Sequence, residues 1–268
     1  GSITLNNSNQ IGTLLSVERG GAFQLVDLGG LTVTGPITAG TTASPVSITT
    51  LGGLLAVNGN ITTTGANDVS LRGSGITQDS ASTINAGTGV ILFDADDGAI
   101  AQNGTLTTGN ATASAVRMID ATTAVLGNIS AAAGGLVLGE ANPNHLSGAV
   151  SQNAGQTITA DRLSIVSGGP VTLENDNLFG TLLAVERGGA LRLRDTAGGL
   201  TITGPITAGT VSNSVTISTA GAALVVNGNI AASGAASVIS LTGPGITQGA
   251  ASTVDANDGA ILLDGNDG

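Results

Sequence analysis

Short runs in which apolar and polar residues alternate recur along the whole chain. Residues 31–35 read LTVTG and residues 46–50 read VSITT, and similar runs recur further along the chain. A period of two is typical of a strand with one buried face, and Val, Ile and Thr favour strands. Gly, Asn, Asp and Ser separate the runs and suit tight corners. The run ASAVRMIDATTAVL at 113–126 comes nearest to a helix, but it lacks a 3.6-residue period and is also predicted to be strand.

Two sequence frames recur at a nearly regular spacing. One resembles LTVTGPITAG at 31–40, and the other is the GITQ of 75–78. Cutting the chain at these frames gives about eleven segments, each of about 21–29 residues and each with two or three strands. Their first residues are Ile3, Leu31, Leu54, Ile76, Ile100, Ala124, Val150, Val171, Leu200, Ala223 and Ile246. Strands of this length at this period predict an all-β fold, a parallel β-helix in which each segment is one coil.

A longer repeat contains the short one. Residues 1–98 align with 169–268 at more than half of the positions. We therefore predict one β-helical rod over 1–268, with one long repeat at 1–168 and an incomplete second copy at 169–268. A β-sandwich is the main alternative. It would need hairpins, and the Asn-Gly pairs at 58–59 and 227–228 lie in the coil frame without paired strands around them.

The composition fits such a rod and excludes several kinds of partner. Apolar residues make up 41% of the chain but aromatic residues only 1%, which suits a narrow interior filled by small aliphatic side chains. The net charge is −11 and no lysine is present, which argues against nucleic acid and anionic membranes as partners. No apolar run is long enough to span a bilayer. The chain has no cysteine, so it has neither disulfides nor cysteine metal sites.

The frames GITQDSASTINAGTGVILFDADDGAIAQ (75–102) and LTVTGPITAG (31–40) resemble the passenger regions of filamentous-haemagglutinin-type adhesins, which use two-partner secretion and are similar to autotransporter passengers. The resemblance covers the whole chain. It implies a right-handed parallel β-helix, export across the bacterial outer membrane and a location at the cell surface. Neither the family's amino-terminal secretion module nor a carboxy-terminal barrel is recognisable, so we expect an internal rod segment.

Acidic corners are the first candidate sites. FDADDG at 93–98 and LDGNDG at 263–268 occupy equivalent places, and DANDG at 255–259 lies one corner earlier. Asp94, Asp96 and Asp97 could supply calcium ligands, but the sequence lacks a full calcium-loop frame. We interpret these clusters as corners with Asp-Gly turn chemistry, and we predict no metal or cofactor.

No catalytic constellation is apparent. Arg192 and Arg194 share one strand face beside Asp195, which would suit polysaccharide lyase chemistry only together with a calcium site. The chain lacks the Trp and Tyr on which sugar rings usually stack. His145 is the only histidine and lies in ANPNHLSG, which we interpret as an exposed loop that interrupts a coil. We therefore predict no enzyme activity.

Three further patterns have structural interpretations. Gln78, Gln102, Gln152 and Gln248 recur in the GITQ frame, and Gln78 and Gln102 could form a side-chain ladder one coil apart. Asn60, Asn128 and Asn229 of the GNI frame are expected to serve corners. Threonine rows such as LTVTG are reminiscent of ice-binding solenoids, but they are interrupted from coil to coil.

The pair Glu18–Arg19 stands before Gly20-Gly21, and VERGGA recurs at 185–190. Adjacent side chains on a strand diverge, so we expect no catalytic pair and predict that one of the two points outward. The copies should mark the same corner of the same coil in successive long repeats.

These observations favour a structural rod segment of a large bacterial surface adhesin, acting in cell attachment or biofilm formation. Binding to a glycan or protein receptor would use outward faces and irregular loops such as 139–148. One alternative is a filament-forming unit that self-associates through its coil ends, because open strand edges can pair. The other is a polysaccharide-acting β-helix enzyme. No nucleic acid partner and no membrane insertion are expected.

Overall fold

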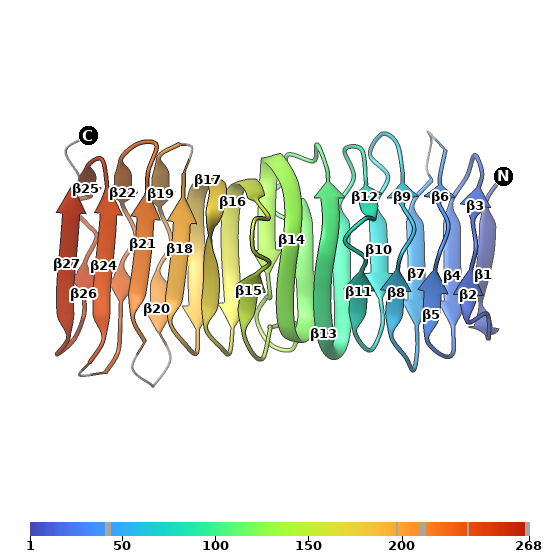
Figure 1. Ribbon diagram of the computed structural model, residues 1–268, viewed down its shortest axis with the longest axis horizontal. Helices are drawn as coiled ribbons and strands as arrows, with labels where there is room; N and C mark the ends of the chain where they lie inside the picture. The colour runs from blue at the N-terminus through green and yellow to red at the C-terminus, as the bar shows by residue number, and fades with distance from the viewer. Residues whose placement is uncertain (41–43, 197, 209–212, 235, 266–268) are drawn as a thin grey trace.

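A computed structural model describes residues 1–40, 44–196, 198–208, 213–234 and 236–265. The described residues form one parallel β-solenoid of about eleven turns, without helices. Figure 1 shows an elongated stack of strands with the two termini at opposite ends. The predicted all-β parallel solenoid and its number of coils are therefore confirmed. No helix in the described part is long and apolar enough to cross a membrane.

The strands are β1 Ile3–Asn9, β2 Thr13–Leu14, β3 Val17–Glu18, β4 Phe23–Asp27, β5 Leu31–Val33, β6 Ile37–Thr38, β7 Val46–Thr50, β8 Leu55–Val57, β9 Ile61–Thr62, β10 Val69–Arg72, β11 Ile76–Gln78, β12 Thr83–Asn85, β13 Ile91–Thr107, β14 Val116–Leu138, β15 Val150–Gln152, β16 Ile158–Ser167, β17 Val171–Arg187, β18 Leu191–Asp195, β19 Leu200–Ile202, β20 Ile206–Ala208, β21 Val215–Thr219, β22 Leu224–Val226, β23 Ile230–Ala231, β24 Val238–Gly243, β25 Ile246–Gln248, β26 Val254–Asp255 and β27 Ala260–Gly265. The run at 113–126 falls largely in β14, so its prediction as strand is confirmed.

Each early turn has three faces, which β4, β5 and β6 exemplify as face 1, face 2 and face 3. Each strand pairs in parallel with the strand of the same face in the next turn, as Leu31 does with Leu55 and Ile37 with Ile61. Strands of three to five residues alternate buried and partly exposed positions, as in Phe23–Asp27. The inward side chains are almost all aliphatic and fully buried, and they form one continuous core. Neighbouring turns therefore bury each other's apolar side chains, as a solenoid requires.

One outward column can be followed through the whole rod on face 2. Its members, paired in turn, are Thr13, Thr32, Ala56, Thr77, Ala101, Val125, Ser151, Thr172, Arg192, Thr216, Ser240 and Leu262. Successive members are 19 residues (Thr13 to Thr32) to 26 residues (Val125 to Ser151) apart. The turns are thus slightly shorter than the 21–29 residues predicted. The threonine rows are interrupted, as the sequence indicates.

The second long repeat is rotated on the rod by one face. Ile3 begins face 1, because it pairs with Phe23. Its counterpart Val171 instead pairs with Val150, which continues face 2. The copies are therefore separated by seven turns and one face. The predicted coil starts were placed at similar sequence frames, and this choice assumed that such frames always lie on the same face. The predicted starts from Leu31 to Val171 do lie on one face, but Leu200, which follows them in the sequence pattern, pairs with Leu224 on another face.

Candidate functional site

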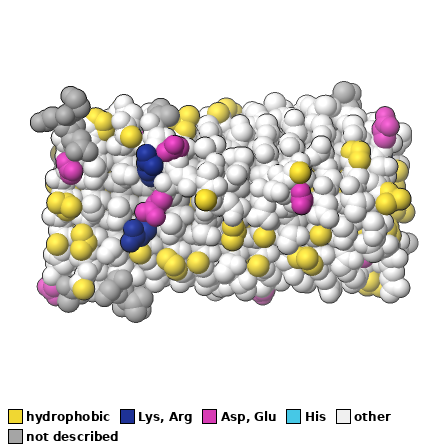
Figure 2. All heavy atoms as spheres, viewed as in Figure 1, with side chains coloured by type: hydrophobic (Ala, Val, Ile, Leu, Met, Phe, Trp, Pro, Cys, Tyr) yellow, Lys and Arg dark blue, Asp and Glu magenta, His cyan; other side chains and the backbone are white. Residues whose placement is uncertain are grey.

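Two ion pairs join outward side chains of successive turns on face 2. Arg192 lies 3.4 Å from Glu174, and Arg194 lies 3.2 Å from Asp176. Figure 2 shows how sparse charged side chains are on one side of the rod. All four side chains are substantially exposed, so each pair contributes little to stability. The shared outward face predicted for the two arginines is confirmed.

The side chain of Asp195 points the other way, into the rod. Its carboxylate accepts a hydrogen bond of 2.7 Å from the Phe179 backbone N–H, and the residue is fully buried. Burial raises the pKa of Asp195, and the hydrogen bond from Phe179 opposes this shift. Asp195 therefore does not join Arg192 and Arg194 in one site, so the structure does not assemble the combination considered for lyase chemistry.

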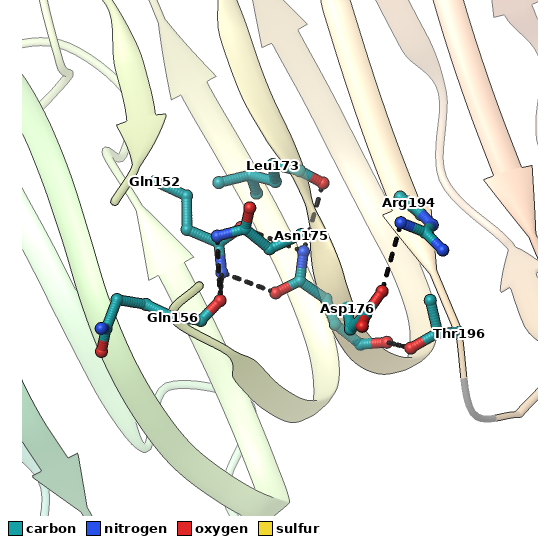
Figure 3. Close-up of polar contacts among 8 residues, drawn as sticks. Gln152, Gln156, Leu173, Asn175, Asp176, Arg194 and Thr196 are labelled. Atoms are coloured by element: carbon teal, nitrogen blue, oxygen red, sulfur yellow. Dashed lines mark hydrogen bonds and ion pairs between the residues drawn. The ribbon is translucent and has the colours of Figure 1, made fainter. Parts of the chain in front are cut away.

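A partly buried network of side-chain amides lies beneath these ion pairs (Figure 3). The side chains of Gln152 and Asn177 exchange hydrogen bonds of 2.8 and 3.1 Å. Asn177 also accepts the Ile158 N–H at 2.9 Å and donates to the Leu173 carbonyl at 3.2 Å. Asn175 donates to the carbonyl of Gln156 at 2.9 Å. These contacts satisfy the polar groups of the corner, so we assign the network a structural role.

The acidic corner contains Asp94, Asp96 and Asp97 beside Arg72. The Arg72 guanidinium lies 2.8 Å from Asp96 and 3.7 Å from Asp94. Asp96 and Asp97 have φ values of 47° and 63°, which are left-handed turn conformations that Asp tolerates better than most residues. Asp120, one turn further on, has its pKa raised by burial and by these three carboxylates.

Within the described ranges, no group of three His, Asp or Glu residues is placed to hold a metal ion. The turn interpretation accounts for the backbone of the corner at 94–97. The related cluster at 263–268 lies partly outside the described residues, because they end at 265. In the third cluster, Asp255 accepts the Asn257 N–H at 2.8 Å, a local turn contact.

The glutamine frame is structural, but not in the way predicted. Gln78 and Gln102 do stack in register in neighbouring turns. Their amides, however, bind main-chain groups instead of each other. Gln78 donates to the Ser82 carbonyl at 3.1 Å, while Gln102 donates to Gly104 and accepts the Gly127 N–H. Gln248 lies on a different face, above Val226.

The asparagines of the GNI frame serve corners, as predicted. Asn60, Asn128 and Asn229 each accept a backbone N–H from a threonine of the following turn, at 2.8, 2.8 and 2.9 Å. The three contacts are equivalent, and each satisfies a main-chain donor where a strand begins.

The duplicated Glu-Arg pairs diverge, as predicted. Glu18 and Glu186 are exposed, whereas Arg19 is partly buried and Arg187 is only 1% exposed. Arg187 donates to the carbonyls of Thr207, Asn213 and Ser214 at 3.0, 3.5 and 3.4 Å. The pairs keep their place in the repeat but lie on different faces of the rod, because Val17 pairs with Ile37 on face 3 and Glu186 pairs with Val166 in the column that continues face 1. The motif itself carries no sign that Arg187 is buried, because Arg19 stands in the same local sequence and is only partly buried.

Raising the pH above 10 should increase the free energy of unfolding through Arg187. Burial lowers the pKa of this guanidinium to about 10, and no lysine, tyrosine or cysteine titrates nearby in pH. Above pH 10 the unfolded state binds more protons at this residue, so the free energy of unfolding should rise by up to about 1.4 kcal/mol per pH unit. Urea unfolding between pH 9 and 11.5, compared with Arg187→Met, measures this. An identical pH dependence in the two proteins would contradict it.

Removing the exposed glutamate should have little effect. The Glu18 carboxylate makes no hydrogen bond or ion pair within the described part of the chain, so Glu18→Ala should change the free energy of unfolding by less than about 0.5 kcal/mol. Thermal unfolding of the two proteins in parallel tests this. A larger loss would mean that the side chain has a stabilising partner.

An open cavity of about 530 Å³ lies where the loop 139–148 leaves the solenoid. The loop overhangs the outward side of β16 and β17, and Leu146 then returns to the core and pairs with Ser167. His145 lines the cavity with Glu186 and Thr207. The predicted loop is therefore confirmed, but His145 is half-buried at a cavity, not freely exposed.

Comparisons with known proteins assign the chain to no family. No family model, no curated protein and no solved structure matches the chain.

Proposed function

We propose that this chain is a rod segment of a large bacterial extracellular surface protein that acts in adhesion. Its role would be to hold binding surfaces away from the cell and to present them to a glycan or protein receptor during attachment or biofilm formation. The resemblance of its frames to filamentous-haemagglutinin-type passengers supports this proposal.

The observation that carries the proposal is the unbroken column on face 2 from Thr13 to Leu262. Strands that stay in register over every turn make a stiff rod, because each turn is packed against the next. Outward side chains are therefore held at fixed places along its length. The rotation of the second long repeat adds to this. Equivalent outward surfaces point in different directions, so the rod can meet partners on more than one side.

Adhesion can be tested with beads coated with the folded chain. They should be retained on layers of bacterial or host cells, whereas beads that carry the same amount of heat-unfolded chain should wash off. Both preparations have the same sequence and charge, so the difference isolates the folded surface. Equal retention of the two kinds of bead would contradict the proposal.

A further inference from the structure

The cavity beside the loop 139–148 is built around a short row of outward side chains. Leu146 pairs with Ser167, and Ser167 pairs with Arg187. His145, Val166 and Glu186 each stand one residue earlier, so they form a row on the outer side. Successive members are one turn apart, and His145 and Glu186 are therefore separated by about 10 Å. All three line the cavity, with Val166 in the middle.

Two hydroxyl groups at this cavity donate to main-chain carbonyls, so their protons are already used. The Thr207 hydroxyl donates to the Val185 carbonyl at 3.4 Å, and the Ser167 hydroxyl donates to Gly148 at 2.8 Å. The Nδ1 atom of His145 lies 3.3 Å from the Pro143 carbonyl, which favours the tautomer that places the proton on Nδ1. The other ring nitrogen then remains an acceptor.

Glu186 supplies the negative charge. Its carboxylate is exposed and forms no hydrogen bond or ion pair in the described part of the chain. The neighbouring Arg187 does not neutralise it through a contact, because its guanidinium points into the core and binds carbonyls of the next turn. The cavity thus offers acceptors at both ends of an apolar centre.

We propose that this cavity binds an aliphatic diamine. One ammonium group would pair with the Glu186 carboxylate, and the other amine would donate to His145. The hydrocarbon chain would lie on Val166 and Ala141, which also line the cavity. A charged donor bound to a carboxylate gives the stronger kind of hydrogen bond, whereas a neutral diol would lack that charge. The site is independent of whether the rod acts in adhesion.

Hexamethylenediamine is the probe, and two-dimensional NMR of the whole chain is the measurement. The diamine should shift the signals of residues 141–145 and 186 with a dissociation constant on the order of 1 mM. Hexylamine and the matching diol should each bind at least about ten-fold more weakly.

Glu186→Gln should weaken diamine binding at least about ten-fold. Glu18→Gln is the matched control, because Glu18 has the same place in the first repeat but no loop above it, and it should leave binding unchanged. His145→Ala should weaken binding and keeps the test valid if the first variant unfolds. Binding that survives Glu186→Gln, equal binding of the diol, or the absence of any shift would each overturn the proposal.

Discussion

Replacing Gly188 with alanine is expected to lower the free energy of unfolding by about 3 kcal/mol. A Cβ at this position would lie 1.9 Å from the carbonyl oxygen of Gly168 in the preceding turn, and 2.6 Å from its carbonyl carbon. The obstacle is backbone, and the Gly188 N–H also donates to Ser167 at 2.9 Å, so the two turns would have to separate. Urea unfolding gives the measurement.

The matched control is Gly20→Ala, at the equivalent place in the first repeat. A Cβ there has nothing within 4 Å, so the free energy of unfolding should change by less than about 1 kcal/mol. The two variants share the same local sequence, RGGA, and differ in the turn that lies beneath them. Equal losses of stability would mean that turn-to-turn contact does not set the requirement for glycine.

Replacing Asn177 with alanine is expected to lower the free energy of unfolding by about 2 kcal/mol. The substitution removes the acceptor of the buried Ile158 N–H and one partner of the partly buried Gln152 amide, which keeps its hydrogen bond of 2.8 Å to the Gln156 carbonyl. A buried polar group without a partner costs about 1–3 kcal/mol, and the Ile158 N–H becomes one. Figure 3 shows how the network joins three successive turns.

Asn9→Ala is the control for this second prediction. Asn9 is the counterpart of Asn177 in the first repeat, but it is only partly buried, and its amide donates to the carbonyls of Leu5, Asn7 and Val26. Water can replace these contacts, so the loss should be about 1 kcal/mol. Thermal unfolding ranks the two variants. A smaller loss for Asn177→Ala than for Asn9→Ala would contradict the assigned role of the network.

The local pattern was enough to predict the strands, the corners and their stacking. Period-two alternation identifies inward positions such as Leu31 and Ile37 without knowledge of what lies above them. The same property explains why the rotation was missed. Any inward column accepts an aliphatic residue, so the nearly identical frames at 31–40 and 200–209 could not indicate which column each would join.

Arg187 and the cavity depend on residues that are distant in the sequence. Arg19 and Arg187 stand in the same motif. Only Arg187 donates hydrogen bonds to the carbonyls of Thr207, Asn213 and Ser214, which lie in the next turn. The cavity needs His145 from a loop and Glu186 from two turns further on. The order and spacing of the residues do not predict that His145 and Glu186 line one cavity. The pairing of Leu146 with Ser167 in the folded chain brings them there.

The protein is a parallel solenoid in which the second long repeat is rotated by one face. Engineered disulfides test this arrangement directly, because the chain has no native cysteine. Ser151 and Thr172 are paired in neighbouring strands, at about 4.8 Å, a separation that a disulfide can bridge. Without the rotation, Ser151 would instead meet Thr181, the counterpart of Thr13 on face 2. We expect Ser151→Cys/Thr172→Cys to oxidise to a disulfide and Ser151→Cys/Thr181→Cys to keep free thiols. The opposite result would contradict the rotation.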